Sequence, residues 1–139
     1  MIDRVCAFVD NDAITLSEFE KTYNETKAKI PTITKDEVLN IMINRILLKR
    51  AAVAMRIMGT DEDKIIAEYI DLKVRSYVII KEEAIEVYYN QHKQELAGAD
   101  ISDVRGDIEK LLIEEDVNAR LKALLADLRK QAYVKLQAE

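Results

Sequence analysis

The densest hydrophobic pattern in the chain runs from Val38 to Met58. Apolar side chains recur there three and four residues apart on two adjacent lines, and further apolar residues widen the stripe. This spacing predicts a helix, and the breadth of its apolar face predicts neighbours packed around much of its circumference. Thr34 and Glu37 form a capping-box pattern before it, and Gly59 is a typical residue after a helix end. We expect this to be the central helix of the domain.

Shorter stretches with helix-start or helix-stop signals lie on both sides of this helix. Thr15 and Glu18 form another capping-box pattern, and Pro31 ends the segment that follows them. The expected helices cover residues 16–30, 61–74, 81–96 and 102–130, with Thr60 and Ser102 as further caps. Residues 76–80 are compatible with either a continued helix or an extended break, and 97–100 form the clearest loop of the second half.

Two short stretches, one near each end of the chain, have the character of β-strands. Arg4 to Val9 is rich in β-branched and aromatic residues and precedes the turn-forming residues 10–12. Ala132 to Leu136 alternates in polarity. Because a lone strand leaves backbone groups unpaired, we expect the two stretches to pair. The prediction is a mostly α fold of several helices with a short strand pair formed by the N- and C-terminal segments.

Composition supports the helical prediction and narrows the function classes. The 139 residues include only three glycines and one proline, which disfavours β-rich architectures. The net charge of −5 and the absence of a basic stripe predict no nucleic acid partner. No apolar run approaches the roughly 18–20 residues of a spanning helix, so we expect no membrane embedding. The single cysteine, Cys6, excludes an internal disulfide, and its apolar neighbours predict a buried side chain.

The segment from Ile2 to Glu18 resembles the opening of the SurA-like periplasmic chaperones and their PpiC-type relatives. Their pattern I-D-R-V-x-A-x-V-N-x-x-x-I-T-x-S-E leads into the first helix. The matching residues are Ile2, Asp3, Arg4, Val5, Ala7, Val9, Ile14, Thr15, Ser17 and Glu18, and Asp10 stands where the family has Asn. Residues 81–89 are similar to the segment before the family's parvulin prolyl-isomerase domain. Residues 103–108 and 128–134 resemble its closing helix and strand.

The resemblance implies a SurA-type chaperone core that occupies residues 1–139 as one domain. Its N-terminal part would be 1–97, and its closing helix and strand would be 102–136. A parvulin domain of about a hundred residues does not fit between these parts, so the resemblance implies neither an isomerase domain nor a cofactor. The implied function is ATP-independent holding of unfolded or outer-membrane-bound polypeptide clients in the periplasm. No secretory leader follows Met1. If the protein is exported, we therefore expect this sequence to begin after the cleavage site of the leader.

Few side chains suggest catalytic or metal-binding chemistry. Residues 10–12 lack the glycine and terminal glutamate that would follow in a calcium loop, and turn formation explains them. His92 has no histidine or cysteine partner at ligand spacing, and its neighbours predict a solvated face. The acidic residues at 61–63 and 82–83 fall at expected helix starts, where the helix dipole favours them. We therefore expect no catalytic, metal or cofactor site.

Methionine and tyrosine side chains are the remaining candidates for a binding surface. At helical spacing such residues commonly face a core, but flexible thioethers and amphipathic phenols also suit a surface that accepts many unfolded sequences. The candidate client-binding residues are Met42, Met55, Met58, Tyr69, Tyr77, Tyr88 and Tyr89. We expect a cleft or a dimer seam beside Glu114–Asp116, the polar break in the last helix.

Two alternative functions stay open from the sequence. One is a structural or assembly module whose apolar surface forms a homodimer interface. The other is a residual prolyl isomerase activity. Sedimentation would test the first alternative, and a proline-limited refolding assay would test the second.

Overall fold

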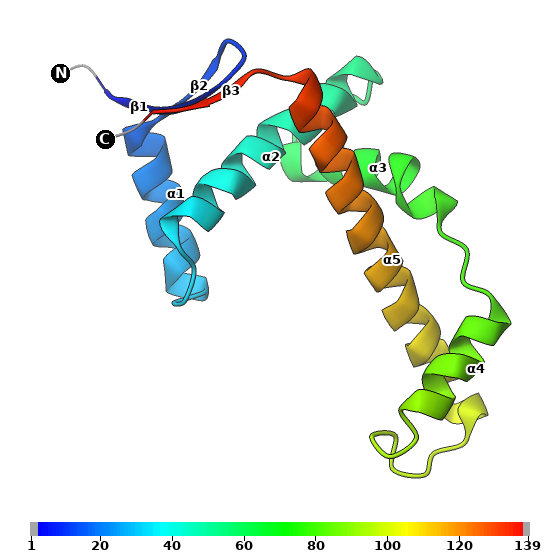
Figure 1. Cartoon of the computed structure of the whole chain (residues 1–139). Helices are drawn as coiled ribbons and strands as arrows, with labels where there is room; N and C mark the ends of the chain where they lie inside the picture. Colours follow the sequence, from blue (N-terminus) through cyan, green and yellow to red (C-terminus); the bar gives the residue numbers. More distant parts are fainter. Residues whose placement is uncertain (1–2, 138–139) are drawn as a thin grey trace. The chain divides into compact units, whose positions relative to one another are not determined.

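The computed structural model describes residues 3–137, so Ile2 of the family pattern lies outside the described residues. They form five α-helices and a three-stranded antiparallel sheet (Figure 1), which confirms the mostly α prediction. The elements are β1 (Val5–Val9), β2 (Asp12–Thr15), α1 (Leu16–Lys29), α2 (Lys35–Ala54), α3 (Glu62–Lys73), the 3-10 helix η1 (Arg75–Tyr77), α4 (Glu82–Gln91), α5 (Ile101–Gln131) and β3 (Val134–Leu136). Among these helices, none is long and apolar enough to cross a membrane.

The chain divides into two compact units, which are described separately. Unit 1 comprises the described residues up to Tyr69 together with those from Leu124 onwards. Unit 2 comprises Ile70–Ala123.

The sheet lies in unit 1 and has the strand order β2-β1-β3. β1 pairs with β3, with Val9 opposite Val134 and Ala7 opposite Leu136, which confirms that the two terminal segments pair. The predicted strand pair is nevertheless incomplete, because β1 also pairs with β2 across the two-residue loop Asp10-Asn11. Asp10 has a φ of 51°, a left-handed conformation that Asp adopts more readily than most residues. Residues 10–12 therefore close a hairpin instead of only leading into a helix.

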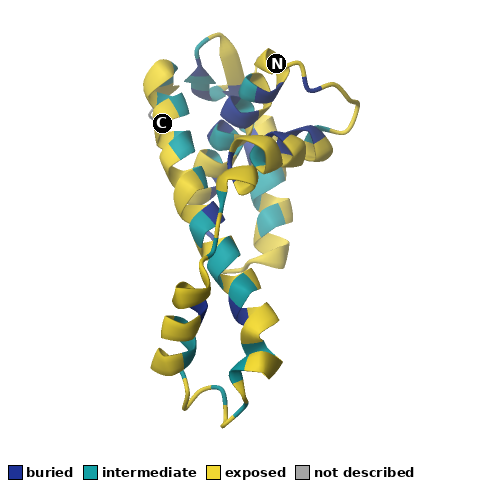
Figure 2. Cartoon of the chain, turned by 90° about the vertical axis from the view of Figure 1, so that its right-hand side faces the viewer, coloured by how far each residue is buried: buried dark blue, intermediate teal, exposed yellow. Residues whose placement is uncertain are grey.

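The core of unit 1 lies between the sheet and the helices α1 and α2. Its members are Ala7, Val9, Ile14, Phe19, Ile33, Val38, Ile43 and Leu47. Figure 2 marks the buried residues in dark blue. Cys6 is half-buried at the edge of this core, so the prediction of a buried thiol is only partly correct.

The central helix α2 is covered on only part of its circumference. Ile41 is 51% exposed and Val53 is 57% exposed, so neighbours cover less of the helix than its broad apolar stripe predicts. Residues of α1 and the sheet belong to the same buried cluster as Val38, Ile43 and Leu47 of α2. Leu48 and Ala52 of α2 are buried as well, so the exposed part of the helix is limited to its remaining side. The uncovered part contributes to a pocket described below.

Side-chain caps begin α1 and α2 as the sequence predicts. The Thr34 hydroxyl oxygen accepts the N–H of Glu37 (3.2 Å), and the Glu37 carboxylate accepts the N–H of Thr34 (3.2 Å), which confirms the capping box. Thr15 accepts the N–H of Glu18 (3.3 Å). The Glu18 carboxylate accepts the Thr15 hydroxyl (2.9 Å) instead of the Thr15 backbone N–H, so only half of the second capping box forms.

Replacing Thr34 by alanine is expected to destabilise the protein by about 1 kcal/mol. The N–H of Glu37 loses the Thr34 hydroxyl that accepts it, and the reciprocal capping box at the start of α2 is broken. Urea unfolding followed by circular dichroism measures the change. Thr32→Ala is the matched control, since Thr32 is exposed and makes no side-chain hydrogen bond within residues 3–137. Equal losses in the two variants would contradict the role of the capping box.

α2 ends at Ala54, before the predicted end next to Gly59. Arg56 takes the left-handed conformation (φ 61°) that glycine commonly takes after a helix. The N–H of Arg56 bonds to the carbonyl three residues earlier (2.9 Å), and the N–H of Ile57 bonds to the carbonyl of Ala52 (3.1 Å). This is a Schellman motif, and the buried Ile57 supplies its hydrophobic contact. The prediction failed because an arginine occupies the position at which glycine is the usual signal.

α3 begins one residue later than its predicted cap implies. The carboxylate of Asp61, not the hydroxyl of Thr60, accepts the N–H of Lys64 (3.3 Å). Asp and Thr both cap helices well, so the sequence offered two adjacent candidates and the wrong one was predicted.

Unit 2 contains the end of α3, η1, α4 and the first part of α5. After η1 the chain is not helical until α4 begins, so the ambiguous residues 76–80 include an extended break. α4 ends at Gln91, earlier than the predicted Leu96, and turns occupy residues 92–98. α5 matches its predicted range closely. The buried residues of unit 2 are Val74, Ile85, Ile108 and Val117.

Asp10 joins three elements of unit 1 at the tip of the hairpin. Its carboxylate accepts the N–H of Tyr133 (2.8 Å) just before β3, and it pairs with the guanidinium of Arg50 on α2 (2.6 Å). Its own N–H donates to the carbonyl of Tyr133 (2.7 Å). The Tyr133 N–H, followed by Arg50, lowers the pKa of the Asp10 carboxyl below its ordinary value of 3.8.

The pH dependence of stability is expected to carry the signature of Asp10. A carboxyl whose pKa is lowered on folding stabilises the folded state above its unfolded pKa, and this stabilisation disappears as pH falls through the folded pKa. Wild type should therefore be more stable than Asp10→Asn near neutral pH, and the difference should vanish in acid below the ordinary value of 3.8. Thermal unfolding across this pH range measures it. Asp12→Asn is the control, because the Asp12 side chain makes no bond within the described residues.

Candidate functional site

The candidate client-binding residues are divided between the two units. Met42, Met55, Met58 and Tyr69 belong to unit 1, and Tyr77, Tyr88 and Tyr89 belong to unit 2. Met55 is 46% exposed and Met58 is 86% exposed after the end of α2. Met42 packs partly against the core, and Tyr69 is buried, which raises the pKa of its phenol through desolvation. In unit 2, Tyr77 is exposed and the other two tyrosines are half-buried.

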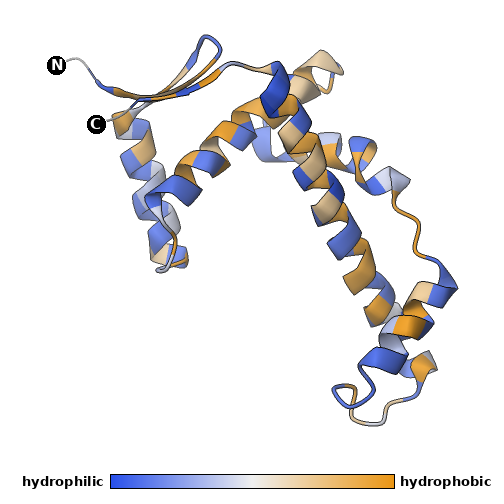
Figure 3. Cartoon of the chain, viewed as in Figure 1, coloured by the Kyte–Doolittle hydropathy of each residue, from blue (hydrophilic) through white to orange (hydrophobic). Residues whose placement is uncertain are grey.

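An open groove of about 760 Å³ lies in unit 2 beside α4. We call it the α4 groove. Its apolar lining consists of Ile79, Ile80, Ala84, Val87, Tyr88 and Leu112. Ile79 and Ile80 belong to the extended segment that precedes α4, which Figure 3 shows in orange because successive residues are hydrophobic. α5 supplies Leu112, so three segments of unit 2 form the walls.

Helix geometry explains why α4 contributes to this groove. Ala84, Val87, Tyr88 and Gln91 are three and four residues apart, which puts them on one face of the helix. Ile85, next to that face, is fully buried and anchors α4 within the protein. Tyr88 is therefore the one candidate client-binding residue that lines the groove.

The most exposed apolar side chains of the groove were not predicted. Ile79 is 81% exposed and Val87 is 53% exposed. Spacing could have grouped Val87 with Tyr88 as residues of one helix face. No local pattern could have shown that Ile79 is exposed, because exposure depends on where the rest of the chain packs.

Tyr89 and His92 hold the end of α4 and the loop that follows. The Tyr89 hydroxyl donates to the carbonyl of Ala99 (2.6 Å), so this tyrosine secures the loop and does not line the groove. The His92 ring stacks on Tyr88 with centroids 3.9 Å apart, and its Nδ1 lies 2.9 Å from the Tyr88 carbonyl. The half-buried ring of His92 is part of the groove wall, so the predicted solvated face is wrong for this residue.

Two arginines hold the helices of unit 2 together around the groove. The Arg105 guanidinium forks onto the Glu82 carboxylate, with Nε 2.9 Å from Oε1, and thus joins the start of α4 to α5. This hydrogen bond lowers the pKa of Glu82. Arg75 likewise binds Glu114 (2.6 Å) and lowers the pKa of that carboxyl. These ion pairs are exposed, so they contribute little to the free energy of folding. Their bidentate geometry nevertheless fixes the orientation of the segments that they join.

The polar break in α5 borders the α4 groove. Glu114 pairs with Arg75, and Asp116 pairs with Arg120 (3.2 Å). Glu115, between them, lines the groove. A groove of unit 2 therefore lies beside the break at which the sequence predicts a cleft or a dimer seam.

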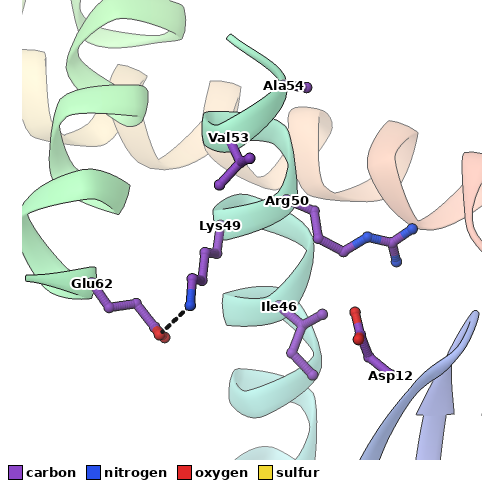
Figure 4. A pocket seen from close by; sticks show the side chains of 7 residues that line it. All are labelled: Asp12, Ile46, Lys49, Arg50, Val53, Ala54 and Glu62. Carbon is purple, nitrogen blue, oxygen red and sulfur yellow. Dashed lines mark hydrogen bonds and ion pairs between the residues drawn. The ribbon is translucent and has the colours of Figure 1, made fainter. Parts of the chain in front are cut away.

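A second cavity, of about 620 Å³, lies in unit 1 and is called the α2 pocket (Figure 4). α2 contributes Ile46, Lys49, Arg50, Val53 and Ala54, β2 contributes Asp12 and α3 contributes Glu62. Lys49 binds Glu62 (3.1 Å), as the dashed line in Figure 4 shows, and Arg50 binds Asp10. The pocket therefore combines an apolar strip of α2 with a charged border.

No group of three or more His, Cys, Asp and Glu side chains within residues 3–137 is arranged to hold a metal ion. The chain matches no model of a known protein family. No curated protein matches it at a significant level. The likeness to SurA-type chaperones is therefore carried by the residue pattern alone.

Proposed function

We propose that the chain is a SurA-type chaperone core that holds unfolded polypeptides, outer-membrane-bound ones among them, in a periplasm without ATP. The observation that carries the proposal is the α4 groove, in which Ile79 and Val87 leave apolar surface open to solvent beside Tyr88 and Leu112. Clustered exposed apolar surface is an aggregation liability, so it commonly marks an interaction site. The resemblance at residues 2–18 supports the family and the compartment in this proposal.

The proposed mechanism is reversible burial of apolar client side chains in the α4 groove. Each square ångström of apolar surface removed from water favours the complex by about 25 cal/mol. The volume of about 760 Å³ falls in the ordinary range of sites for small ligands or a few side chains. Lys81, Glu83 and Glu115 line the same groove and supply charges that stay hydrated. They would keep the loaded complex soluble, as the net charge of −5 would.

The lining suits clients of many sequences. Aliphatic side chains bind by non-directional burial, and the amphipathic ring of Tyr88 adds apolar contact with a polar end. The stack of Tyr88 on His92 holds this ring in place at the groove wall. Neither contact requires a particular client side chain.

Light scattering of an unfolded outer-membrane β-barrel protein, diluted from urea with and without the chain, tests the proposal. We expect near-stoichiometric chain to suppress aggregation without ATP. A groove variant, Ile79→Ser with Val87→Ser, should suppress it less. If folded wild-type chain has no effect on the scattering, the holding function is wrong.

The competing homodimer function makes a different prediction for the same surface. If the α4 groove is a permanent interface between two copies, sedimentation velocity will show a dimer whose population falls in the groove variant. A monomer at all concentrations, together with suppression of aggregation, will favour the chaperone. A stable dimer without suppression will favour an assembly module.

A further inference from the structure

Within residues 3–137, β2 is an edge strand that pairs with β1 on one side only. The backbone groups of Cys6 and Asp10 form hydrogen bonds with the C-terminal segment. Backbone groups of successive residues point to opposite edges of a strand, so those of Ala7 and Val9 point towards β2. Val9 and Ala7 lie opposite Asp12 and Ile14. The same alternation turns the N–H and C=O of Ala13, between these two residues, to the outer edge of the sheet.

The α2 pocket begins at this free edge. Asp12 and Ile14 lie on one face of β2 because side chains alternate along a strand. Ile14 is buried in the core, and Asp12 projects from the same face towards α2, where it lines the pocket with Ile46 and Val53 (Figure 4). A strand added at the Ala13 edge would therefore have one row of its side chains directed towards the α2 pocket.

The charge of the pocket identifies the side chain that fits there. Lys49 is bound to Glu62 and Arg50 is bound to Asp10. The Asp12 carboxylate makes no salt bridge or hydrogen bond within the described residues. It is the charged group of the pocket that has no ion-pair partner, and its negative charge complements a cationic side chain.

We propose that Asp12, Ala13, Ile46 and Val53 form a second binding site, the β2-edge site, for an extended polypeptide segment that adds to the sheet as a fourth strand. The backbone of the segment bonds to Ala13. A lysine or arginine of the segment lies beside Asp12, and apolar side chains two residues away cover Ile46 and Val53. The proposal rests on the proposed function for its class of partner, an unfolded polypeptide, but the site lies in unit 1 and is separate from the α4 groove.

This binding mode gives a client pattern that the α4 groove does not require. Main-chain bonds at a sheet edge are independent of sequence, and alternate side chains supply the specificity. The site should therefore select a basic residue with apolar residues two positions before and after it. Moving the basic residue by one position turns it to the opposite face and removes it from Asp12.

Two synthetic peptides of identical composition test this pattern. Both are nine residues long, with polar residues on one face of the extended strand and apolar residues on the other. In the first peptide a lysine takes the central apolar position, and in the second it is moved by one position. The full chain carrying Ile79→Ser and Val87→Ser is used, so that the α4 groove does not dominate binding. Fluorescence anisotropy of labelled peptide measures the Kd, and NMR measures solvent exchange of the Ala13 amide.

We expect the first peptide to bind about threefold more tightly, which is the scale of one exposed ion pair. Asp12→Asn should reduce the two affinities to the same value. Ala13→Pro removes an outward N–H and should weaken both peptides by about tenfold, whereas Ala13→Val should not. Exchange of the Ala13 amide should slow when the first peptide binds, and this measurement stands even where the proline variant does not fold.

Equal affinities for the two peptides, or an Ala13 amide that exchanges at the same rate with and without peptide, would overturn the β2-edge site. Failure of both peptides to bind would overturn it as well. None of these three results decides the proposed function. That function is tested separately, by whether the wild-type chain suppresses aggregation.

Discussion

Replacing Ile43 by alanine is expected to destabilise the protein by about 2–5 kcal/mol, the range for large-to-small changes in a packed core. Ile43 is fully buried on α2 within the core of unit 1. The substitution removes three carbon atoms. Its cost combines their lost burial with the cavity that the surrounding sheet and helix α1 fill only in part. Urea unfolding followed by circular dichroism measures the loss.

Ile41→Ala is the matched control for this prediction. The substitution is the same and the helix is the same, but Ile41 is 51% exposed. We expect a change within about 0.5 kcal/mol, as for most surface positions. Comparable losses at the two positions would mean that α2 packs on both of these sides and that its exposed face is wrongly assigned.

The predictions that succeeded rest on local chemistry or on long patterns. The capping box of Thr34 and Glu37 has a purely local cause, so it formed as predicted. α5 was recognised from a long apolar repeat. The pairing of β1 with β3 followed from the need of each terminal strand for a hydrogen-bonding partner, although the strands lie at opposite ends of the chain.

β2 was missed because one residue serves two elements. Thr15 is the last residue of β2 and also the cap of α1, and its side-chain signal indicated only the helix. The strand is short and begins with Asp12, a residue type that is depleted in strands. Tertiary pairing with β1 overrides this weak local preference.

The binding surface was predictable only in part, because helical spacing does not distinguish buried faces from exposed ones. Tyr69 and Tyr88 have the same residue type and both lie on helices, yet Tyr69 is buried and Tyr88 lines the α4 groove. Ile79 is exposed in an extended break whose sequence, rich in β-branched residues, resembles a buried strand. For Tyr88 and Ile79 the outcome depends on how α4 and the segment before it pack beside α5, and neither segment specifies this packing alone.

The groove variant, Ile79→Ser with Val87→Ser, is expected to bind an unfolded client about 30-fold more weakly than wild type. Full burial of an aliphatic side chain is worth about 1.5–3 kcal/mol. Both side chains are already partly covered in the free protein, so partial burial on binding gives a combined loss of about 2 kcal/mol, which corresponds to this factor. Isothermal titration with an unfolded β-barrel protein, kept soluble in dilute urea, measures the affinity.

A second double variant, Leu72→Ser with Leu111→Ser, separates the groove from general surface hydrophobicity. Leu72 is 49% exposed and Leu111 is 40% exposed, both in unit 2, and neither lines the α4 groove. This control variant removes as many aliphatic side chains as the groove variant. A non-specific effect of surface hydrophobicity would therefore weaken client binding equally in both variants. We expect the control to bind within about twofold of wild type, because scattered exposed apolar residues contribute little to binding. Similar weakening in both variants would show that clients bind apolar surface wherever it occurs and would remove the α4 groove from the mechanism.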